Sequence, residues 1–390
     1  EINQTIDDFS KSNDTIKHYS VSKLTLAQYF QNKNYKDKIL TLNRINSHLV
    51  EIIRFRDMID LSYGSFYSFD DSSLENFSLS SPYNNGFFLL FPHDCIHQSV
   101  VLDLPKHIDS VTQYTQWSRQ HAFDSIQNIN QQLVSNMKNI HAMAAKSKDF
   151  DYSRISKIVD ILVSEFPKKR MISVAGESSS GKSTFSHNLK QFIDCHFDHK
   201  FDCQIIQMDS YFLNRDERPL DENGKIDFES INIINIDLLA SRIDSLLKGD
   251  SIPARRYNYV NGIGCDLSDE TISLSQDGFV IVEGLHAINP TFTKKVKNTD
   301  IFKVYISPVA PLNIDDNHLL NPDDILLLRR IVRDFNQRGS LPRTNIGRWP
   351  NVIMSASKYI IPFIPTVNVY YINQLPFELN AMAPVVLQLL

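Results

Sequence analysis

A short segment rich in glycine and serine constrains the fold of this chain more than any other feature. Residues 176–183 read GESSSGKS, with the apolar run MISVA before them and a stretch without proline or glycine after them. The glycines let the backbone curl so that its N–H groups point inward, and a helix that starts there adds partial positive charge. The spacing G-x-x-x-x-G-K-S between a strand and a helix therefore predicts a phosphate-binding loop.

Short apolar runs alternate with stretches of helical pattern from about residue 170 onward. Runs separated by helices are typical of parallel strands that are covered on both faces. We therefore expect an α/β fold, with a doubly wound parallel sheet of the P-loop type in the C-terminal half. The expected strands are Met171–Ala175, Gln204–Met208, Phe279–Val282, Phe302–Ile306 and Val367–Ile372.

The loop also predicts where ATP and Mg²⁺ bind. Lys182 is expected to reach the β- and γ-phosphates, and the Ser183 hydroxyl is expected to bind Mg²⁺. A chance glycine turn is the alternative, but the strand and helix on either side argue against it. The predicted nucleotide-binding residues are Gly176, Ser178, Ser179, Ser180, Gly181, Lys182, Ser183 and Thr184.

Acidic residues follow two of the expected strands, at the edge where open α/β sheets bind ligands. Asp209 in QMDSYF can accept the proton of an attacking hydroxyl, or it can cap a helix. Glu283 ends FVIVEG, an apolar run followed by an acid, and is expected to hold Mg²⁺ directly or through water. A surface glutamate after a strand is the alternative for Glu283.

Arginines are concentrated in LLLRRIVRDFNQRG, residues 326–339. On a helix Arg329 and Arg333 would share one face, and Gly339 would end the helix. Guanidinium groups on such a segment suit a lid that closes over phosphates and neutralises charge on the transferring phosphoryl group. A solvated, salt-bridged helix is the alternative, which the order of the segments after a phosphate loop disfavours.

These motifs together resemble a known family. In this order, GESSSGKST, QMDSYF, VIVEGLHA, VYIS and LLRRIVRDFNQRG resemble the uridine kinase family within the phosphoribulokinase/uridine kinase group, over roughly residues 165–375. The resemblance implies that Asp209 is the catalytic base, with Lys182 and the lid arginines Arg333 and Arg338 as further catalytic residues. The substrate-binding residues that it implies are Asp209, Tyr211, Asp227, Phe228, Tyr257, Tyr259 and Arg329.

The implied activity is phosphorylation of the 5′-hydroxyl of uridine or cytidine by ATP, as in pyrimidine salvage. The segment RRYNYVNG departs from the family, because uridine kinases usually carry Asp between the two aromatic residues and a His a few residues later. Here Asn258 lies between the tyrosines, and Asn261 and Gly262 occupy the neighbourhood of the His. Since a few buried hydrogen bonds decide such selectivity, a phosphosugar or a pantothenate-like acceptor stays open.

The chain looks especially like a subgroup in which a region similar to the N-terminal part of threonyl-tRNA synthetase precedes the kinase. MIDLSYGSFYSF is the most recognisable part of that region. We expect an α+β domain over residues 1–105, a helical connector over 106–165 and a kinase domain over 166–390. The His and Cys–His motifs of synthetase editing domains are not found, and HDCIH at residues 93–97 is too tight for a structural zinc site.

Composition narrows the function classes further. The formal net charge is −5, whereas a general nucleic-acid binder usually has a basic surplus. An RNA-binding module without phosphate transfer is therefore the weaker alternative, and the missing N-K-x-D motif argues against a GTPase. We expect a small-molecule nucleoside as the partner, and a homo-oligomer stays open.

The sequence also bears on where the protein works. Its four cysteines are scattered, and the opening residues EINQTIDDFS lack signal-peptide character. No apolar run approaches the roughly 20 residues that span a bilayer. We therefore expect a cytoplasmic protein with no membrane partner.

Overall fold

The computed structural model divides the chain into two compact units. The smaller unit comprises residues 1–104, 125–131 and 312–319, and the larger unit comprises 105–124, 132–311 and 320–390. The HDCIH segment lies outside the described residues. The structure describes residues 16–63, 78–79, 89–90, 105–136, 138–196, 201–220, 224, 226–307 and 312–390.

The smaller unit contains an antiparallel sheet in the order β1-β2-β3, formed by Lys17–Ser22, Leu49–Phe55 and Met58–Leu61. Helices α2 (Lys23–Lys33) and α3 (Lys36–Arg44) supply apolar side chains to the same core as the sheet. A separate pair of short strands, β4 (Ser78–Leu79) and β5 (Leu89–Leu90), is also antiparallel. The buried core of the unit is formed by Leu26, Phe30, Leu42, Val50, Ile52 and Leu61.

A segment from late in the chain completes the smaller unit. Asp315 is fully buried, and its Oδ2 accepts a hydrogen bond of 2.9 Å from the Tyr63 hydroxyl. The Nδ1 of His318 lies 2.7 Å from Oδ1, and the buried ammonium of Lys38 lies 3.7 Å from Oδ2. Lys38 also forms an ion pair with Asp60, so the two carboxylates of this cluster share one ammonium.

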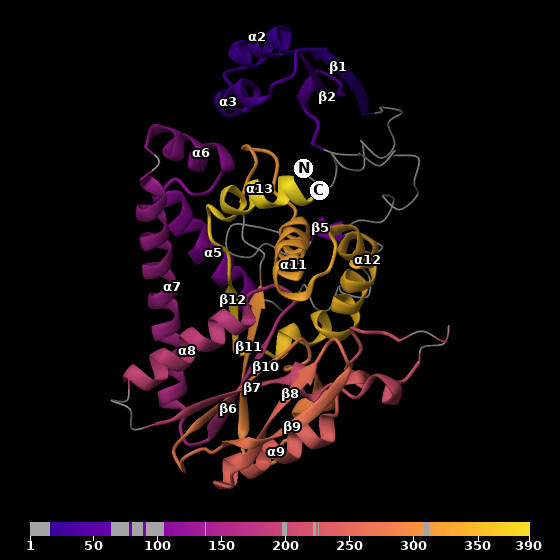
Figure 1. The fold of residues 1–390 in the computed structure, drawn as a ribbon. Helices are drawn as coiled ribbons and strands as arrows, with labels where there is room; N and C mark the ends of the chain where they lie inside the picture. The colour runs from indigo at the N-terminus through magenta and orange to yellow at the C-terminus, as the bar shows by residue number, and fades with distance from the viewer. Residues whose placement is uncertain are drawn as a thin grey trace. The chain divides into compact units, whose positions relative to one another are not determined.

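The larger unit is built on a five-stranded parallel sheet (Figure 1). The strand order is β12-β11-β6-β10-β7, and all four neighbouring pairs are parallel. The five apolar runs expected from the sequence form these strands, and the α/β fold is confirmed. The strands are β6 (Lys169–Ala175), β7 (Cys203–Gln207), β10 (Phe279–Glu283), β11 (Asp300–Ser307) and β12 (Val369–Ile372).

Helices α7 (Asn139–Ser164) and α8 (Lys182–His196) contribute to the core on one face of the sheet. Phe279 and Ile281 of β10 belong to that core, whereas the alternate Val280 and Val282 point to the opposite face. All four side chains are fully buried, so the strand is covered on both faces, as its continuous apolar run predicts. Burial of each such side chain stabilises the fold by about 1.5–3 kcal/mol.

Helices α5 (Pro105–Gln120) and α6 (Ile126–Ser135) precede α7. The chain turns between α5 and α6, where Ala122 adopts a positive φ of 53°. Trp117 of α5 stacks on Phe150 of α7 with ring centroids 4.4 Å apart. No helix among the described residues is long and apolar enough to cross a membrane.

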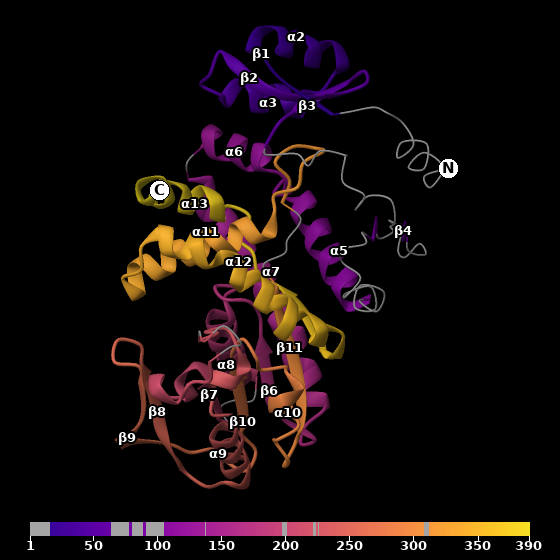
Figure 2. The ribbon, with the colours of Figure 1, turned by 90° about the vertical axis from the view of Figure 1, so that its right-hand side faces the viewer.

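The remaining elements of the larger unit lie between β7 and the end of the chain (Figure 2). The antiparallel hairpin of β8 and β9 follows α9, and α11 and α12 are consecutive helices near the end of the chain. In chain order, the remaining elements are η3 (Met208–Tyr211), η4 (Arg215–Glu217), η5 (Ile231–Ile233), α9 (Ile236–Lys248), β8 (Ile252–Asn258), β9 (Ile263–Ile272), α10 (Pro290–Thr293), α11 (Pro322–Arg338), α12 (Pro342–Tyr359), η6 (Ile361–Thr366) and α13 (Glu378–Leu389).

Candidate functional site

The glycine-rich loop joins the end of β6 to the start of α8, as the sequence predicts. A Cβ atom at Gly176 would lie 2.4 Å from the carbonyl oxygen of Ile306, and Gly181 has a φ of +91°. Both positions therefore require glycine. The Nζ of Lys182 donates to the carbonyl oxygens of Gly176, at 3.0 Å, and Glu177, at 2.9 Å, so the lysine folds back over the loop.

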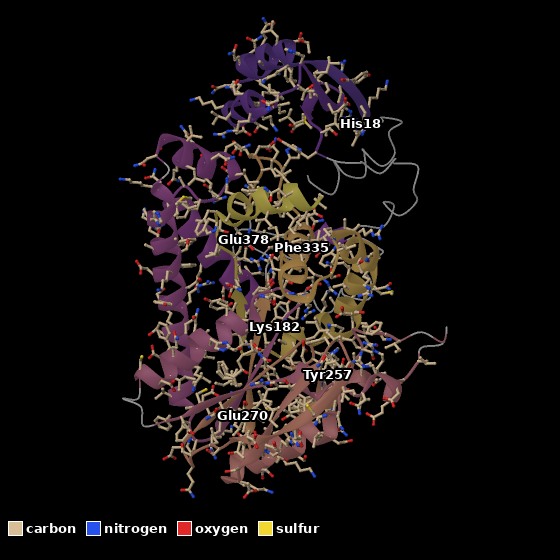
Figure 3. The ribbon with its side chains drawn as sticks, viewed as in Figure 1. His18, Lys182, Tyr257, Glu270, Phe335 and Glu378 are labelled. Atoms are coloured by element: carbon tan, nitrogen blue, oxygen red, sulfur yellow. The ribbon has the colours of Figure 1, made fainter. Side chains whose placement is uncertain are left out.

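Lys182, which is labelled in Figure 3, lies near several charged side chains. Burial lowers the pKa of its ammonium, and the carboxylates of Asp209, Glu283 and Glu177 oppose that shift. An ammonium with several carboxylates nearby attracts anions only weakly until a bound cation balances the negative charge. The site is therefore suited to a nucleotide that arrives together with a divalent ion.

Ser183 and Glu283 meet at the carboxyl edge of the sheet. The Ser183 hydroxyl donates to Oε1 of Glu283 at 2.9 Å, and Glu283 is only 5% exposed. The other carboxylate oxygen, Oε2, is buried and has no hydrogen-bond partner among the residues that the structure describes. A hydroxyl beside an unpartnered carboxylate oxygen fits Mg²⁺, which prefers oxygen ligands.

The rest of the loop is held by β11 and by the end of β12. The Tyr305 hydroxyl donates to the side chain of Glu177, whose pKa is raised by burial. The side-chain amide of Asn373 donates to the carbonyl oxygen of Ser180 at 2.7 Å. Within the described part of the chain, the buried hydroxyl oxygens of Ser179 and Ser180 have no partner, whereas Thr184 is exposed in the first turn of α8.

Asp209 lies in η3, immediately after β7. Its Oδ2 accepts a hydrogen bond of 3.2 Å from the Tyr259 hydroxyl of the turn after β8. Burial, reinforced by the Asp209 carboxylate, raises the pKa of Tyr259, so the phenol stays a hydrogen-bond donor at neutral pH. The structure thus brings Asp209, Lys182 and Tyr259 to one site, although they come from separate segments.

Aromatic side chains form one wall of the site, which we call the aromatic wall (Phe212, Phe228, Tyr257 and Tyr259). The Tyr257 and Tyr259 rings meet edge to face, 5.3 Å apart. The guanidinium of Arg218 lies over three rings, 5.2 Å from Tyr257, 5.4 Å from Phe212 and 5.8 Å from Phe228, and also donates to the Tyr257 hydroxyl. Phe228 is 56% exposed, so its ring is available to a ligand.

Asn258, between the two tyrosines, holds the turn of the hairpin. Its Oδ1 accepts from the backbone N–H groups of Val260, at 2.9 Å, and Asn261, at 3.1 Å. Gly262 completes the turn with a φ of 73°. The residue that departs from the family pattern therefore has a local structural role.

Tyr211 lies beneath the hairpin and is only 2% exposed. The guanidinium groups of Arg242 and Arg255 lie 5.7 Å and 5.9 Å from the centre of its ring. Burial raises the pKa of the Tyr211 hydroxyl. Its ring therefore supports the hairpin from the interior.

The arginines of α11 point to different places. Nη1 of Arg333 donates to the Ser178 hydroxyl of the loop at 3.2 Å, and the Arg338 guanidinium lies 5.2 Å from the centre of the Tyr259 ring. The helix ends at Gly339, as expected, with a φ of 62°. Arg333 and Arg338 thus reach the loop and the aromatic wall, respectively.

Arg329 has a different environment. Its guanidinium forms an ion pair with Glu378 of α13, with Nη2 2.5 Å from Oε2. Nη2 also donates to the backbone carbonyl of Asn373 at 2.9 Å. The structure therefore joins Arg329 to the C-terminal helix and to the residue that follows β12.

A second wall, the acidic wall (Asp227, Glu229 and Ser230), faces α11 and α12. Both Nη atoms of Arg330 lie 3.4 Å from Oε1 of Glu229, whose pKa is raised by burial. The Tyr359 hydroxyl lies 3.4 Å from both Oδ2 of Asp227 and Oγ of Ser230. Sequence reasoning named Asp227 but missed Glu229, because its pairing with Arg330 joins residues 101 positions apart.

Comparison with known proteins assigns the part of the chain that carries this site to one family. The model of the Phosphoribulokinase / Uridine kinase family matches residues 171–373, more than half of the 390-residue chain. The uridine kinase of Lactobacillus helveticus (strain DPC 4571) is 26% identical over 178 residues, which cover 46% of this chain and 74% of that protein. The uridine kinase of Clostridium perfringens (strain 13 / Type A) is 27% identical over 186 residues, which cover 47% and 76%.

Solved structures give weaker matches. A putative fructose transport system kinase from Silicibacter sp. TM1040 has a TM-score of 0.43 and 12% identity, and the match covers 56% of this chain and 98% of that one. A possible uridine kinase from Bacillus stearothermophilus has a TM-score of 0.37 and 15% identity, and the match covers 56% and 97%.

Proposed function

Because the chain belongs to the phosphoribulokinase/uridine kinase family, we propose that it transfers the γ-phosphate of ATP to the 5′-hydroxyl of uridine or cytidine. The chain is a phosphotransferase of the P-loop kinase type. The relatives named uridine kinase support a nucleoside acceptor, and the product would be the 5′-monophosphate, as in pyrimidine salvage. The observation that carries the proposal is the position of Asp209 between the phosphate loop and the aromatic wall.

The phosphate loop would bind the ATP phosphates. Backbone N–H groups of residues 176–184 and the Lys182 ammonium would hold the β- and γ-phosphates, which requires Lys182 to release the loop carbonyls. Ser183 and Glu283 would hold Mg²⁺, and their hydrogen bond and the unpartnered Oε2 support this assignment. When bound, Mg²⁺ neutralises charge on the phosphates during transfer.

Asp209 would act as the general base. Its carboxylate would accept the proton of the 5′-hydroxyl while that oxygen attacks the γ-phosphorus in line with the bond that breaks. The hydrogen bond from Tyr259 would hold the Asp209 carboxylate in place for this step. Arg333 and Arg338 would close over the phosphates and stabilise the charge of the transition state.

The two walls would bind the nucleoside. The base would stack among Phe228, Tyr257 and Tyr259, and the sugar would lie toward Asp227 of the acidic wall. Tyr211 would support the hairpin from beneath, and Arg329 would act through its contact with the residue after β12. Because Asn258 is used in the turn, a different acceptor with a primary hydroxyl, such as a phosphosugar, is the second candidate.

We propose a supporting role for the N-terminal part of the chain. Residues 1–105 would form a domain related to the N-terminal part of threonyl-tRNA synthetase, followed by a helical connector over 106–165 and the kinase domain over 166–390. The domain would shape oligomerisation or regulate the kinase without editing activity of its own. We also propose that the protein works in the cytoplasm.

The proposal is tested by measuring ADP release from Mg-ATP with a panel of nucleosides, and with phosphosugars as controls. Stimulation by uridine or cytidine, with the 5′-monophosphate as the product, is the expected result. Stimulation by a phosphosugar alone would favour the second candidate. ATP binding without transfer to any acceptor would contradict both and leave a nucleotide-dependent binding protein.

A further inference from the structure

One buried histidine lies behind the acidic wall and has no role in the proposed function. His286 follows Glu283 closely in the chain, just beyond the end of β10, and is only 2% exposed. Its Nε2 lies 2.9 Å from the backbone carbonyl oxygen of Glu229. The histidine therefore fixes the backbone of the wall that pairs with Arg330.

The hydrogen bond determines which ring nitrogen carries the hydrogen. A carbonyl oxygen can only accept, so Nε2 of His286 must be the donor. Burial lowers the pKa of the ring to about 4, so the imidazole is neutral near pH 7. Nδ1 is then an unprotonated acceptor, as expected for the tautomer set by the bond to Glu229.

This acceptor is unused by the protein. Nδ1 of His286 is buried and has no hydrogen-bond partner in the described part of the chain. Buried polar atoms are nearly always paired, so an acceptor without a donor calls for a partner that is not part of the chain, such as a water molecule, an ion or a bound ligand. Leaving such an acceptor without a donor destabilises the folded protein, whereas a ligand hydroxyl would remove that penalty on binding.

His286 lies beside residues that we propose to bind the nucleoside. Its ring meets Tyr359 edge to face at 5.4 Å, and the Tyr359 hydroxyl lies 3.4 Å from both Asp227 and Ser230 of the acidic wall. The Lys182 ammonium also contributes to the low pKa of the ring. Tyr359 therefore links His286 to Asp227, toward which the sugar of the nucleoside would lie.

We propose that Nδ1 of His286 accepts a hydrogen bond from a second hydroxyl of the acceptor, which for a nucleoside is the 2′- or 3′-hydroxyl of the ribose. This rests on the proposed function, since it assumes a nucleoside whose 5′-hydroxyl lies at Asp209. A substrate that lacks the matching hydroxyl would leave the buried Nδ1 without a hydrogen-bond donor. Such a substrate would therefore be phosphorylated less efficiently. His286 thus acts as a specificity-determining residue for the sugar.

Two substitutions of His286 distinguish the roles of its two ring nitrogens, because each substitution retains the hydrogen-bonding function of only one of them. In His286→Gln the side-chain amide can still donate to the Glu229 carbonyl, but no acceptor remains at the position of Nδ1. In His286→Asn the shorter amide oxygen can replace Nδ1, but the donor to Glu229 is lost. The experiment measures kcat/KM of the full chain for uridine, 2′-deoxyuridine and 3′-deoxyuridine with the wild type and both variants.

We expect the wild type to discriminate at least about tenfold against one of the two deoxynucleosides. His286→Gln should reduce that discrimination to about threefold or less, while discrimination against the other deoxynucleoside stays unchanged. His286→Asn should keep part of the wild-type discrimination against the first deoxynucleoside, because its amide oxygen can still accept a hydrogen bond. A parallel loss of kcat/KM for all three nucleosides would overturn the inference and leave a purely structural histidine.

Failure of this inference is distinct from failure of the proposed function. A wild type that phosphorylates no nucleoside would overturn both, whereas an active wild type with parallel losses would overturn the histidine alone. If His286→Gln does not fold, nitrogen NMR of the wild type replaces it. A change in the Nδ1 resonance of His286 when uridine is added to the ADP-bound protein would support the contact, and an unchanged resonance would overturn it.

Discussion

Ser183 and Glu283 are joined by a hydrogen bond of 2.9 Å, although 100 positions separate them in the sequence. The bond joins the first turn of α8 to the end of β10. It places a hydroxyl and a buried carboxylate together at the phosphate loop, where the second carboxylate oxygen has no partner within the described residues. This pair is where we expect Mg²⁺ to bind.

The first prediction concerns that carboxylate. Glu283→Gln keeps a side-chain oxygen for the Ser183 hydroxyl but removes the charge that would hold Mg²⁺. We expect kcat to fall by about 100-fold or more and half-maximal activation to need more Mg²⁺. The measurement is ADP release during Mg²⁺ titration, with Glu270→Gln on the exposed surface of β9 as the matched control. An unchanged Mg²⁺ dependence in Glu283→Gln would remove it as a metal ligand.

The second prediction contrasts two neighbouring arginines of α11. Arg333→Ala removes the guanidinium that reaches Ser178 in the loop, so we expect kcat to fall by about 100- to 1,000-fold. Arg329→Ala leaves Glu378 without its ion-pair partner, so we expect the free energy of unfolding to fall by roughly 3 kcal/mol. Urea unfolding and steady-state kinetics of both variants measure these two effects. A larger loss of kcat in Arg329→Ala and a larger loss of stability in Arg333→Ala would contradict the roles given to the two arginines.

The third prediction concerns the turn of the hairpin. Asn258→Asp keeps an oxygen for the backbone N–H groups of Val260 and Asn261, whereas Asn258→Ala leaves both without it. We expect the alanine variant to raise the KM for the acceptor by about five- to tenfold, because the loss of each bond costs about 1 kcal/mol. The aspartate variant should stay within about threefold of the wild type, and the KM for ATP should change in neither. Equal effects of the two substitutions would mean that the Asn258 side chain acts on the acceptor rather than on the turn.

The fourth prediction concerns pH and stability. His107 of α5 meets the ring of Tyr370 at 4.3 Å, and burial lowers its pKa to about 4. Above the ordinary pKa of about 6.5 the ring is neutral in both the folded and unfolded states. As the pH falls toward 4 only the unfolded chain takes up the proton, so the folded state loses stability.

We therefore expect the His107 ring to cost the wild type roughly 2–3 kcal/mol of unfolding free energy between pH 7.5 and pH 4.5. His107→Phe keeps an aromatic ring against Tyr370 but cannot take up a proton, so its stability should fall less over that range. Urea unfolding at the two pH values measures the difference. The same loss in both proteins would show that His107 does not contribute.

Local sequence patterns were enough to predict the strands of the parallel sheet and the phosphate loop. A buried parallel strand needs a continuous apolar run, and the loop needs glycine where a Cβ would meet the backbone, as at Gly176. Both requirements act within a few residues, so the sequence displays them directly.

The contacts that complete the site were not predictable in this way. Arg330 forms an ion pair with Glu229, and His286 donates a hydrogen bond to the Glu229 carbonyl. Neither contact corresponds to a motif or a regular spacing that could be recognised in the sequence. The smaller unit gives a further case, since Tyr63 donates to Asp315 from 252 positions away. Such contacts depend on how distant segments fold together.

The rate of phosphoryl transfer by Asp209→Asn, measured in a single turnover with saturating Mg-ATP and uridine, tests the central claim most directly. Asparagine keeps the hydrogen bond from Tyr259 but cannot accept the proton, so transfer should slow by about 100- to 10,000-fold, with ATP affinity unchanged. Asp216→Asn, at an exposed position in η4, is the matched control and should transfer phosphate at the wild-type rate. Near wild-type transfer by Asp209→Asn would remove Asp209 as the base and contradict the mechanism proposed for this site.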